Sequence, residues 1–270
     1  MKEFKLGFLG MGNMAGAILN GILRSGSIAR SDMIVCEANV DRLKEMYDLG
    51  LATTSIAEEV FLKSEYVIIA VKPQQFRAIA PTSFRNARNY QNRAIITIMA
   101  GVYRQELANV FFTNKICRVM PNLPILVGQG MSALCYDTIP SEDKLFIKSI
   151  FSSIGTVIEI TENKMDAVTS ISGSGPAYVY YFIDSMIRAG IQNGLTEQEA
   201  RVLTLNTFYG ATKQVEQYEN VPINVLIQNV CSKGGTTIEA INVFQNNNLD
   251  NVIIDGIDKC YQRSIELSKK

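Results

Sequence analysis

The chain carries a glycine turn near its N-terminus, Gly10-Met11-Gly12-Asn13-Met14-Ala15, between an apolar strand-like run and a helix-like stretch. A turn of the form G-x-G-x-x-A in that position is the fingerprint of a dinucleotide-binding unit. Gly10 allows the tight turn, Gly12 leaves room for a pyrophosphate, and Ala15 lets the helix pack closely on the strand. We therefore expect a Rossmann-type unit that binds a dinucleotide. The alternative is a glycine turn without a nucleotide.

Short β-branched runs alternate with helix-like stretches from residue 5 to about residue 160. This alternation is typical of βαβ units that build a parallel sheet. It predicts an α/β fold in which a doubly wound sheet forms the first domain, residues 1–161. The expected strands span residues 5–9, 33–37, 66–71, 94–98 and 116–119, with 131–136 and 156–160 as edge additions.

The second part of the chain, residues 162–270, lacks strand-like runs, and its apolar residues recur at helical spacing. This period predicts a second, all-α domain. The stretch 178–183 is so apolar that we expect burial against a second subunit or within the chain's own core. Thr196-Glu197-Gln198-Glu199 matches a capping box. The expected helices span residues 176–193, 197–218, 222–230, 237–245 and 250–269.

The bulk composition favours small-molecule partners. At 270 residues and 47% apolar content, the chain can bury a substantial core. Its 26 Lys and Arg balance its 26 Asp and Glu, so no basic surplus favours nucleic acid or an anionic membrane. The longest apolar runs are far too short to cross a bilayer. We expect neither nucleic acid nor membrane as a partner, and we expect the cytoplasm as the location.

Cysteine and histidine usage narrows the chemistry. The five cysteines are scattered and never form C-x-x-C, which predicts reduced structural thiols and no metal site. The chain has no histidine, which excludes Ser-His-Asp hydrolysis, Cys-His nucleophilic catalysis and the H-E-x-x-H zinc site. Demanding chemistry is therefore expected to come from a bound cofactor.

The end of the second expected strand bears on the choice of dinucleotide. Glu37 stands where an acidic side chain accepts hydrogen bonds from the adenosine ribose hydroxyls, which favours NAD(H). Asn39 and Arg42 lie just beyond it, and an amide with a guanidinium is able to hold a 2′-phosphate, which favours NADP(H). These residues alone leave the choice open, and solvated surface charges are the alternative interpretation.

Two further strand ends are candidates for cofactor contact. Ala70-Val71-Lys72-Pro73 closes one expected strand, at the edge of a parallel sheet where ligands of this architecture bind. Met99-Ala100-Gly101 closes the next strand with small residues, which suits a nicotinamide ring lying against backbone. A simple strand-to-helix turn is the alternative for the second motif.

A second glycine motif lies near the C-terminus, at Ser232-Lys233-Gly234-Gly235-Thr236-Thr237, just before a helix-like stretch. Adjacent glycines permit positive φ and close approach of a ligand to the main chain. The following helix N-terminus adds about half a positive charge. We expect the motif to bind a small anion such as a carboxylate.

These segments together resemble the pyrroline-5-carboxylate reductase family over essentially the whole chain. The first glycine turn is shared by many dehydrogenases, whereas the later motifs are far more specific in order and spacing. The motifs that carry the resemblance are 10–15, 70–73, 100–102, Met120-Pro121-Asn122-Leu123-Pro124, Ser172-Gly173-Ser174-Gly175-Pro176-Ala177-Tyr178 and 232–240.

The resemblance implies a Rossmann domain and an all-helical dimerisation domain, often in a ring of dimers, with active sites at the dimer interface. It implies hydride transfer from NADP(H), or from NAD(H) because of Glu37, to 1-pyrroline-5-carboxylate, which gives L-proline. Thr237 would hydrogen-bond the ring nitrogen of the substrate, and residues 232–236 would hold the substrate's carboxylate. Cofactor contacts would fall on Leu9, Gly10, Met11, Gly12, Asn13, Met14, Asn39, Ala70, Val71, Lys72, Pro73, Met99, Ala100 and Gly101.

This chain departs from the family pattern at three places, which bear on the substrate more than on the fold. Lys233 stands where the family usually has proline, and Ile125 where many members have alanine. The stretch 222–230 is one residue longer than usual.

Two rival functions stand beside this expectation. The first is a reductase or dehydrogenase that acts on another small imine or on a β-hydroxy acid. The second is a non-catalytic regulatory protein that has kept dinucleotide binding.

Overall fold

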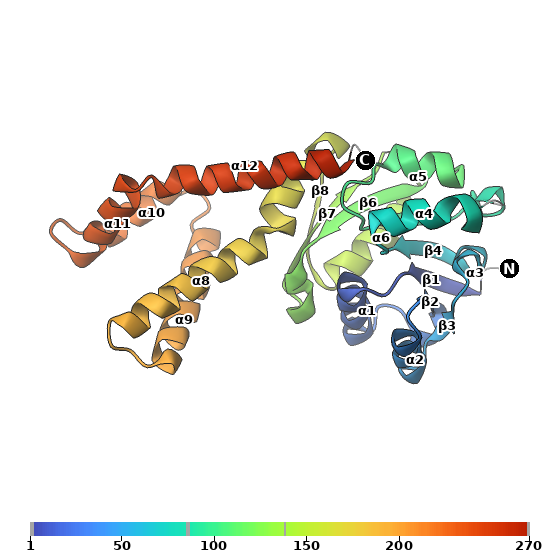
Figure 1. Cartoon of the computed structure of the whole chain (residues 1–270), viewed down its shortest axis with the longest axis horizontal. Helices are drawn as coiled ribbons and strands as arrows, with labels where there is room; N and C mark the ends of the chain where they lie inside the picture. The colour runs from blue at the N-terminus through green and yellow to red at the C-terminus, as the bar shows by residue number, and fades with distance from the viewer. Residues whose placement is uncertain (1–2, 85–86, 138, 269–270) are drawn as a thin grey trace. The chain divides into compact units, whose positions relative to one another are not determined.

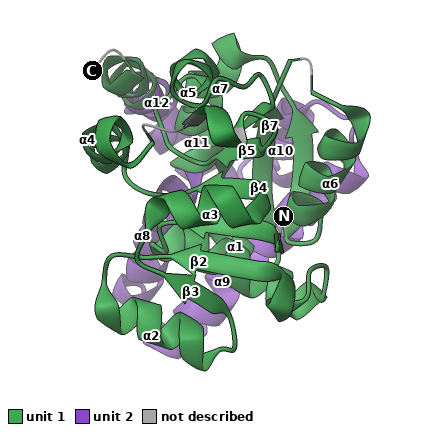
Figure 2. Ribbon diagram, turned by 90° about the vertical axis from the view of Figure 1, so that its right-hand side faces the viewer, with its two compact units in different colours: residues 1–174, 260–270 green, residues 175–259 purple. Residues whose placement is uncertain are grey.

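The computed structural model describes residues 3–84, 87–137 and 139–268 of the chain. The chain divides into two compact units, which Figure 2 colours separately. Unit 1 comprises Met1–Ser174 together with Cys260–Lys270, and unit 2 comprises Gly175–Lys259. The domain division after residue 161 stays a prediction.

Unit 1 is built on one sheet, which has eight strands in the described residues, in the order β3-β2-β1-β4-β5-β6-β7-β8. Neighbouring strands run parallel except for β6 and β7, which are antiparallel. The predicted α/β fold with a doubly wound sheet is confirmed (Figure 1). The strands are β1 Phe4–Leu9, β2 Met33–Cys36, β3 Ala52–Thr54, β4 Ser64–Ile69, β5 Ala94–Thr97, β6 Ile116–Pro121, β7 Gly130–Cys135 and β8 Gly155–Glu159.

Helices cover both faces of this sheet, because the central strands are apolar on both sides. Phe8 of β1 belongs to one core cluster, in which Ile18 and Phe151 come from helices α1 and α6. The neighbouring Leu9 belongs to the other cluster, in which Phe61 comes from α3. The helices of this unit are α1 Asn13–Ser25, α2 Val40–Asp48, α3 Ala57–Lys63, α4 Pro73–Ser83, α5 Arg104–Phe111 and α6 Ser141–Ser152.

Some strand ends differ from the predicted ends by one or two residues. β2 stops at Cys36 and β4 at Ile69, before the predicted ends at residues 37 and 71, although Glu37 N still donates to Thr54 O at 3.3 Å and Ala70 N to Leu9 O at 2.8 Å. β6 continues to Pro121, two residues past the prediction, and pairs with β7. β3 was not predicted, because a three-residue edge strand is too short to show a period.

Unit 1 ends in a short helical connection and also contains the last turns of the final helix. The connection consists of η4 Glu162–Lys164, α7 Met165–Val168 and a π-helical turn, η5 Thr169–Gly173. Met165 is fully buried in a third core cluster with Met120 and Ala133. The final helix, α12, spans Leu249–Ser268, and its residues from 260 onward belong to this unit.

Unit 2 is helical, as predicted. Its helices are α8 Gly175–Gln192, α9 Glu197–Gln217, α10 Ile223–Val230, α11 Thr236–Asn246 and the first part of α12. The predicted capping box is present: Glu199 N donates to Thr196 Oγ1 at 3.3 Å, and Thr196 N donates to Glu199 Oε2 at 2.8 Å. Lys269, the predicted end of the last helix, lies outside the described residues.

The helices of unit 2 bury few side chains. Of its residues, all of which the structure describes, Ala200 and Thr204 alone are buried. Tyr180 and Tyr181 of α8 are 54% and 70% exposed. Long apolar helices therefore leave large side chains uncovered within a single chain. In the described part of the chain, no helix is long and apolar enough to span a bilayer.

Candidate active site

The first glycine turn has the geometry that its sequence predicts. Gly10 has φ +90°, and a Cβ there would lie 2.6 Å from Val71 Cγ1. Its N–H donates to the carbonyl of Cys36 at 2.8 Å, which fixes the turn to β2. Gly12 is the N-cap of α1, and a Cβ on it would meet open space among the described residues. Gly10 therefore makes the turn, and Gly12 leaves room for a ligand at a helix N-terminus.

Glu37 lies beneath this turn and is tied to the main chain. Its Oε2 accepts a hydrogen bond from Met11 N at 2.7 Å, and its Oε1 accepts one from Asn39 N at 2.9 Å. Each carboxylate oxygen has further lone pairs, so these bonds orient the side chain without using up its capacity. The carboxylate thus holds the glycine turn and the end of β2 together.

Arg42 approaches the same turn from helix α2. Its Nη1 donates to the carbonyl of Met11 at 2.5 Å, and its Nη2 donates to Asn13 Oδ1 at 3.4 Å. Asn39 caps the helix, because its Oδ1 accepts the N–H of Arg42 at 3.0 Å. A guanidinium has five N–H donors, so Arg42 retains donors for a phosphate. The cation and the Glu37 carboxylate therefore stand on either side of Met11.

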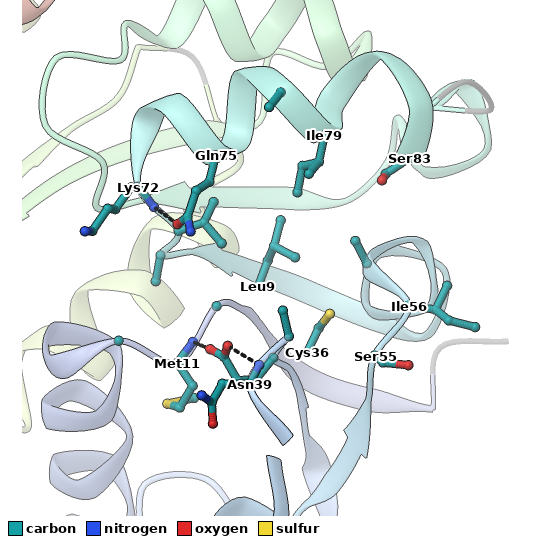
Figure 3. A pocket seen from close by; sticks show the side chains of 18 of the residues that line it. Leu9, Met11, Cys36, Asn39, Ser55, Ile56, Lys72, Gln75, Ile79 and Ser83 are labelled. Carbon is teal, nitrogen blue, oxygen red and sulfur yellow. Dashed lines mark hydrogen bonds between the residues drawn. The ribbon is translucent and has the colours of Figure 1, made fainter. Parts of the chain in front are cut away.

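A cavity of about 780 Å³ opens at the carboxyl ends of β1, β2 and β4. Figure 3 shows it between the glycine turn and the end of β2 on one side and helix α4 on the other. This is the edge at which doubly wound sheets bind ligands. The predicted cofactor residues that line it are Leu9, Gly10, Met11, Gly12, Glu37, Asn39, Arg42, Ala70, Val71 and Lys72.

Other predicted cofactor residues are not part of this lining, and their roles stay predictions. Asn13 and Met14 begin α1, and Pro73 begins α4. Met99 is 2% exposed, and its N–H donates to Thr97 Oγ1 at 3.2 Å. Ala100 and Gly101 follow Met99 in the β5–α5 loop, where Gly101 has φ +71°.

Several residues that line the cavity were not predicted. Ser55 and Ile56 come from the loop after β3, and Gln75, Ile79 and Ser83 come from α4 (Figure 3). The short edge strand gave no periodic signal, so the loop after it was not placed at the sheet edge. Thr53 and Thr54, which are β-branched and lie between Gly50 and Ser55, are a local signal of a short strand there.

Cys36 also lines this cavity, at the end of β2. Burial raises the pKa of its thiol to about 11, and the nearby carboxylates of Glu37 and Glu59 add to the rise. The side chain is therefore a neutral thiol at physiological pH and not a nucleophile. Among the described residues, no cluster of three or more Cys, Asp or Glu is arranged to hold a metal ion.

The second glycine motif lies in unit 2, at the start of helix α11. Gly234 has φ +73°, and Gly235 N donates to the carbonyl of Ser232 at 2.9 Å. Gly235 is the N-cap, so the helix begins at Thr236, one residue before the predicted start. Thr237 is therefore in the first turn and not at the cap. The exposed Ser232 and Lys233 precede this turn, whose free N–H groups suit an anion.

Ile125 belongs to the core. It is fully buried in a 3₁₀ turn, and a Cβ on Gly130 would lie 2.1 Å from its Cγ1. Its carbonyl accepts a hydrogen bond from Arg24 Nη2 at 3.3 Å. The larger residue is accommodated beside a glycine in the core.

Comparison with known proteins gives full-length matches. Residues 162–267 match the family model for pyrroline-5-carboxylate reductase dimerisation, and residues 5–101 match that for NADP oxidoreductase, coenzyme F420-dependent. A pyrroline-5-carboxylate reductase of Synechocystis sp. is 36% identical over 99% of this chain and 100% of its own length. The structure of Plasmodium falciparum pyrroline carboxylate reductase with NADP bound is 31% identical, with a TM-score of 0.87 over 99% of each chain. That of the Coxiella burnetii pyrroline-5-carboxylate reductase is 29% identical, with a TM-score of 0.86 over 99% of this chain and 100% of its own.

The mostly parallel sheet, the glycine turn and the cavity at the strand ends define an NAD(P)-dependent oxidoreductase with a dinucleotide-binding Rossmann unit. The helical part matches a dimerisation domain. The chain belongs to the pyrroline-5-carboxylate reductase family.

Proposed function

We propose that the protein reduces 1-pyrroline-5-carboxylate to L-proline with a reduced nicotinamide dinucleotide. The observation that carries this proposal is the full-length match to curated pyrroline-5-carboxylate reductases, combined with a cavity at the glycine turn. Hydride adds to the imine carbon, which is the ring carbon double-bonded to nitrogen, and a proton adds to the nitrogen, so that the C=N bond becomes a C–N bond of proline. The expected location is the cytoplasm.

The cavity suits the adenosine and pyrophosphate parts of the cofactor. Gly12 leaves space at the N-terminus of α1, where main-chain N–H groups bind a pyrophosphate. Val71 and Lys72 line the opposite wall. Residues 99–101 would receive the nicotinamide end. When bound, the reduced nicotinamide supplies the hydride.

The second glycine motif would hold the substrate. The N–H groups at the start of α11 and the hydroxyls of Ser232 and Thr236 would bind its carboxylate. Thr237 would hydrogen-bond the ring nitrogen and keep the imine carbon in position. A threonine is a weak acid, so the imine would arrive protonated or take its proton from water. Positioning supplies much of the rate acceleration, so this site works without histidine.

The cofactor pocket would accept both NADPH and NADH. Arg42 and Asn39 favour a 2′-phosphate, whereas the Glu37 carboxylate repels one and accepts ribose hydroxyls. The Glu37 carboxylate and the Arg42 guanidinium are both hydrogen-bonded to the main chain of Met11, so both side chains face the glycine turn. The NADP-bound relative from Plasmodium supports NADP(H) as one of the two cofactors.

Steady-state KM values for NADPH and NADH test this cofactor proposal. Glu37→Gln removes the negative charge and is expected to shift the preference toward NADPH by roughly tenfold, which corresponds to about 1.4 kcal/mol. Arg42→Gln is the matched variant and is expected to shift it toward NADH. An unchanged preference in both variants contradicts these roles.

The helical unit would form a homodimer through the large side chains that its helix α8 leaves exposed. Tyr180, Tyr181 and Met186 of α8 are exposed in one chain, and the dimerisation model covers this region. Dimers would assemble further into a ring. Light scattering of the purified full chain tests both levels of assembly, and a monomer at micromolar concentration contradicts them.

One assay separates the proposed activity from its rivals. The purified chain is mixed with NADPH or NADH and 1-pyrroline-5-carboxylate, and loss of the reduced nicotinamide absorbance is followed together with proline formation. Turnover supports the proposal. Turnover of a β-hydroxy acid or another cyclic imine in preference indicates the first rival. Dinucleotide binding without turnover of any of them indicates a regulatory protein.

A further inference from the structure

The last turns of α12, which belong to unit 1, contact the rest of that unit along one helix face. Cys260 Sγ donates to Ser174 Oγ at 3.3 Å, and Ser264 Oγ donates to Asp166 Oδ1 at 2.6 Å. The backbone of residues 267–268 lies against Gly101. Residues 260, 264 and 267–268 are spaced by about one turn, so they share one face of the helix. All of these partners belong to unit 1.

The contact at Gly101 is a close approach between two backbones. A Cβ on Gly101 would lie 3.1 Å from both Leu267 C and Ser268 N, and 3.2 Å from Leu267 O. Gly101 also has φ +71°, a conformation that disfavours other residues. The loop that carries Met99 and Ala100 therefore rests directly on the end of α12.

The bond between Ser264 and Asp166 holds that end in place. Ser264 is 5% exposed and Asp166 is 8% exposed, so the bond is shielded from water. Its acceptor is a carboxylate, which makes the bond stronger than one between neutral groups. Asp166 lies on α7, next to the fully buried Met165. The last turn of α12 is thus fixed between α7 and the β5–α5 loop.

We propose that Ser264 is a positioning residue for hydride transfer. Through its bond to Asp166 it holds the last turn of α12 against Gly101, and that turn sets the position of residues 99–101. The inference rests on the proposed function, in which this loop receives the nicotinamide end of the cofactor. Binding of the adenosine part of the cofactor does not depend on this contact, because neither α12 nor residues 99–101 line the cavity at the glycine turn.

The experiment compares turnover with binding in Ser264→Ala of the full chain. Because a small displacement of reacting groups costs up to roughly 100-fold in rate, we expect kcat to fall roughly 10- to 100-fold. The dissociation constant of ADP-ribose, which lacks the nicotinamide, is expected to stay within about twofold of wild type, because the adenosine cavity is untouched. The fluorescence of bound NADPH is expected to change, since it reports on the nicotinamide surroundings.

Two variants serve as matched controls. Asp166→Asn keeps the Oδ1 acceptor and is expected to retain kcat within about threefold. Arg263→Ala removes an exposed ion pair with Glu266 on the same turn and is expected to leave kcat and NADPH fluorescence unchanged. Loss of kcat in Ser264→Ala alone indicates that the buried bond, and not the helix surface, carries the effect.

The inference is overturned if Ser264→Ala folds and keeps the wild-type kcat, or if ADP-ribose binding falls in parallel with kcat. Should that variant fail to fold, a chain ending at Glu266 tests the same contact, since it keeps Ser264 and removes residues 267–270. Wild-type kcat in the shortened chain overturns the inference equally. A wild-type protein without turnover of 1-pyrroline-5-carboxylate refutes the proposed function instead, and NADPH fluorescence then tests the loop contact alone.

Discussion

Unit 1 and unit 2 bury their apolar residues to very different extents. In unit 1, Phe8, Ile18 and Phe61 are completely buried between the sheet and its helices. In unit 2, the long apolar helix α8 leaves Tyr181 70% exposed. The dinucleotide-binding unit therefore stabilises itself, whereas the helical unit needs another surface to cover its side chains. Changes in the two units should accordingly differ in their dependence on protein concentration.

The largest expected effect is on the stability of unit 1. Phe61 is buried in a cluster with Phe84 and Phe111, at centroid distances of 4.9 Å and 4.8 Å. Phe61→Ala is expected to lower the free energy of unfolding by about 3–5 kcal/mol, because it leaves a cavity in the core. Leu62→Ala, on the same helix but 40% exposed, is the control. Denaturant unfolding at several protein concentrations gives the comparison, and an equal effect in both variants contradicts a self-contained core.

The next effect is on catalysis and concerns unit 2. Thr237→Ala is expected to lower kcat by roughly 100-fold, or about 2.7 kcal/mol, because it removes the hydrogen bond proposed for the ring nitrogen. The KM for NADPH is expected to change little. Thr212→Ala is the matched control, because Thr212 is exposed on α9 and its hydroxyl donates a hydrogen bond to the carbonyl of Phe208 in the same helix. Steady-state rates within about twofold of wild type would refute the role of Thr237.

A third change tests the exposed face of unit 2. Tyr181→Asp places a charge on α8 and is expected to weaken dimerisation by roughly tenfold or more, because burying an unpaired charge is costly. Tyr47→Asp is matched to it, since Tyr47 of α2 in unit 1 is 69% exposed. Sedimentation velocity over a range of concentrations measures both. If the two variants sediment alike, α8 is not the dimer face.

The smallest effect is a loss of stability at alkaline pH, which originates in unit 1. Burial raises the pKa of Cys36 and of Cys135 to about 11, and burial, together with the bond to Asp143, raises the pKa of Tyr66. Above the ordinary pKa values, 9.0 for the thiols and 10.0 for the tyrosine, the unfolded chain loses these protons before the folded chain does, so stability falls as pH rises toward 11.

Denaturation midpoints between about pH 8 and about pH 10 measure this loss, and the wild-type midpoint is expected to fall across that interval. Cys36→Ala removes one of the groups and is expected to reduce the fall. A stability that rises with pH in this range would contradict the burial of these protons.

The sequence predicted the elements more reliably than it predicted the walls of the site. The glycine turn at Gly10 and the capping box at Thr196 depend on residues only a few positions apart, and both are present. The edge strand β3 was missed, so the loop with Ser55 and Ile56 was not placed in the cavity. The strand is defined by its pairing with β2, which local pattern does not reveal.

The role of Glu37 also required the fold. The sequence predicted its position at a strand end. The two roles considered, ribose acceptor and surface charge, did not include the hydrogen bonds that it accepts from Met11 N and Asn39 N. Those bonds depend on how the glycine turn of β1 approaches the end of β2. Helix α11 begins one residue before its predicted start for a related reason. Gly235 is the N-cap, and its N–H donates to the carbonyl of Ser232.

Local pattern established the alternation of strands and helices, the dinucleotide fingerprint and the resemblance to a reductase family, since each depends on residue types at short fixed spacing. Only the folded chain brought Ser264 to Asp166 and the end of α12 to Gly101. These contacts join segments far apart in the chain, and their geometry follows from how buried elements pack, which short-range spacing does not encode.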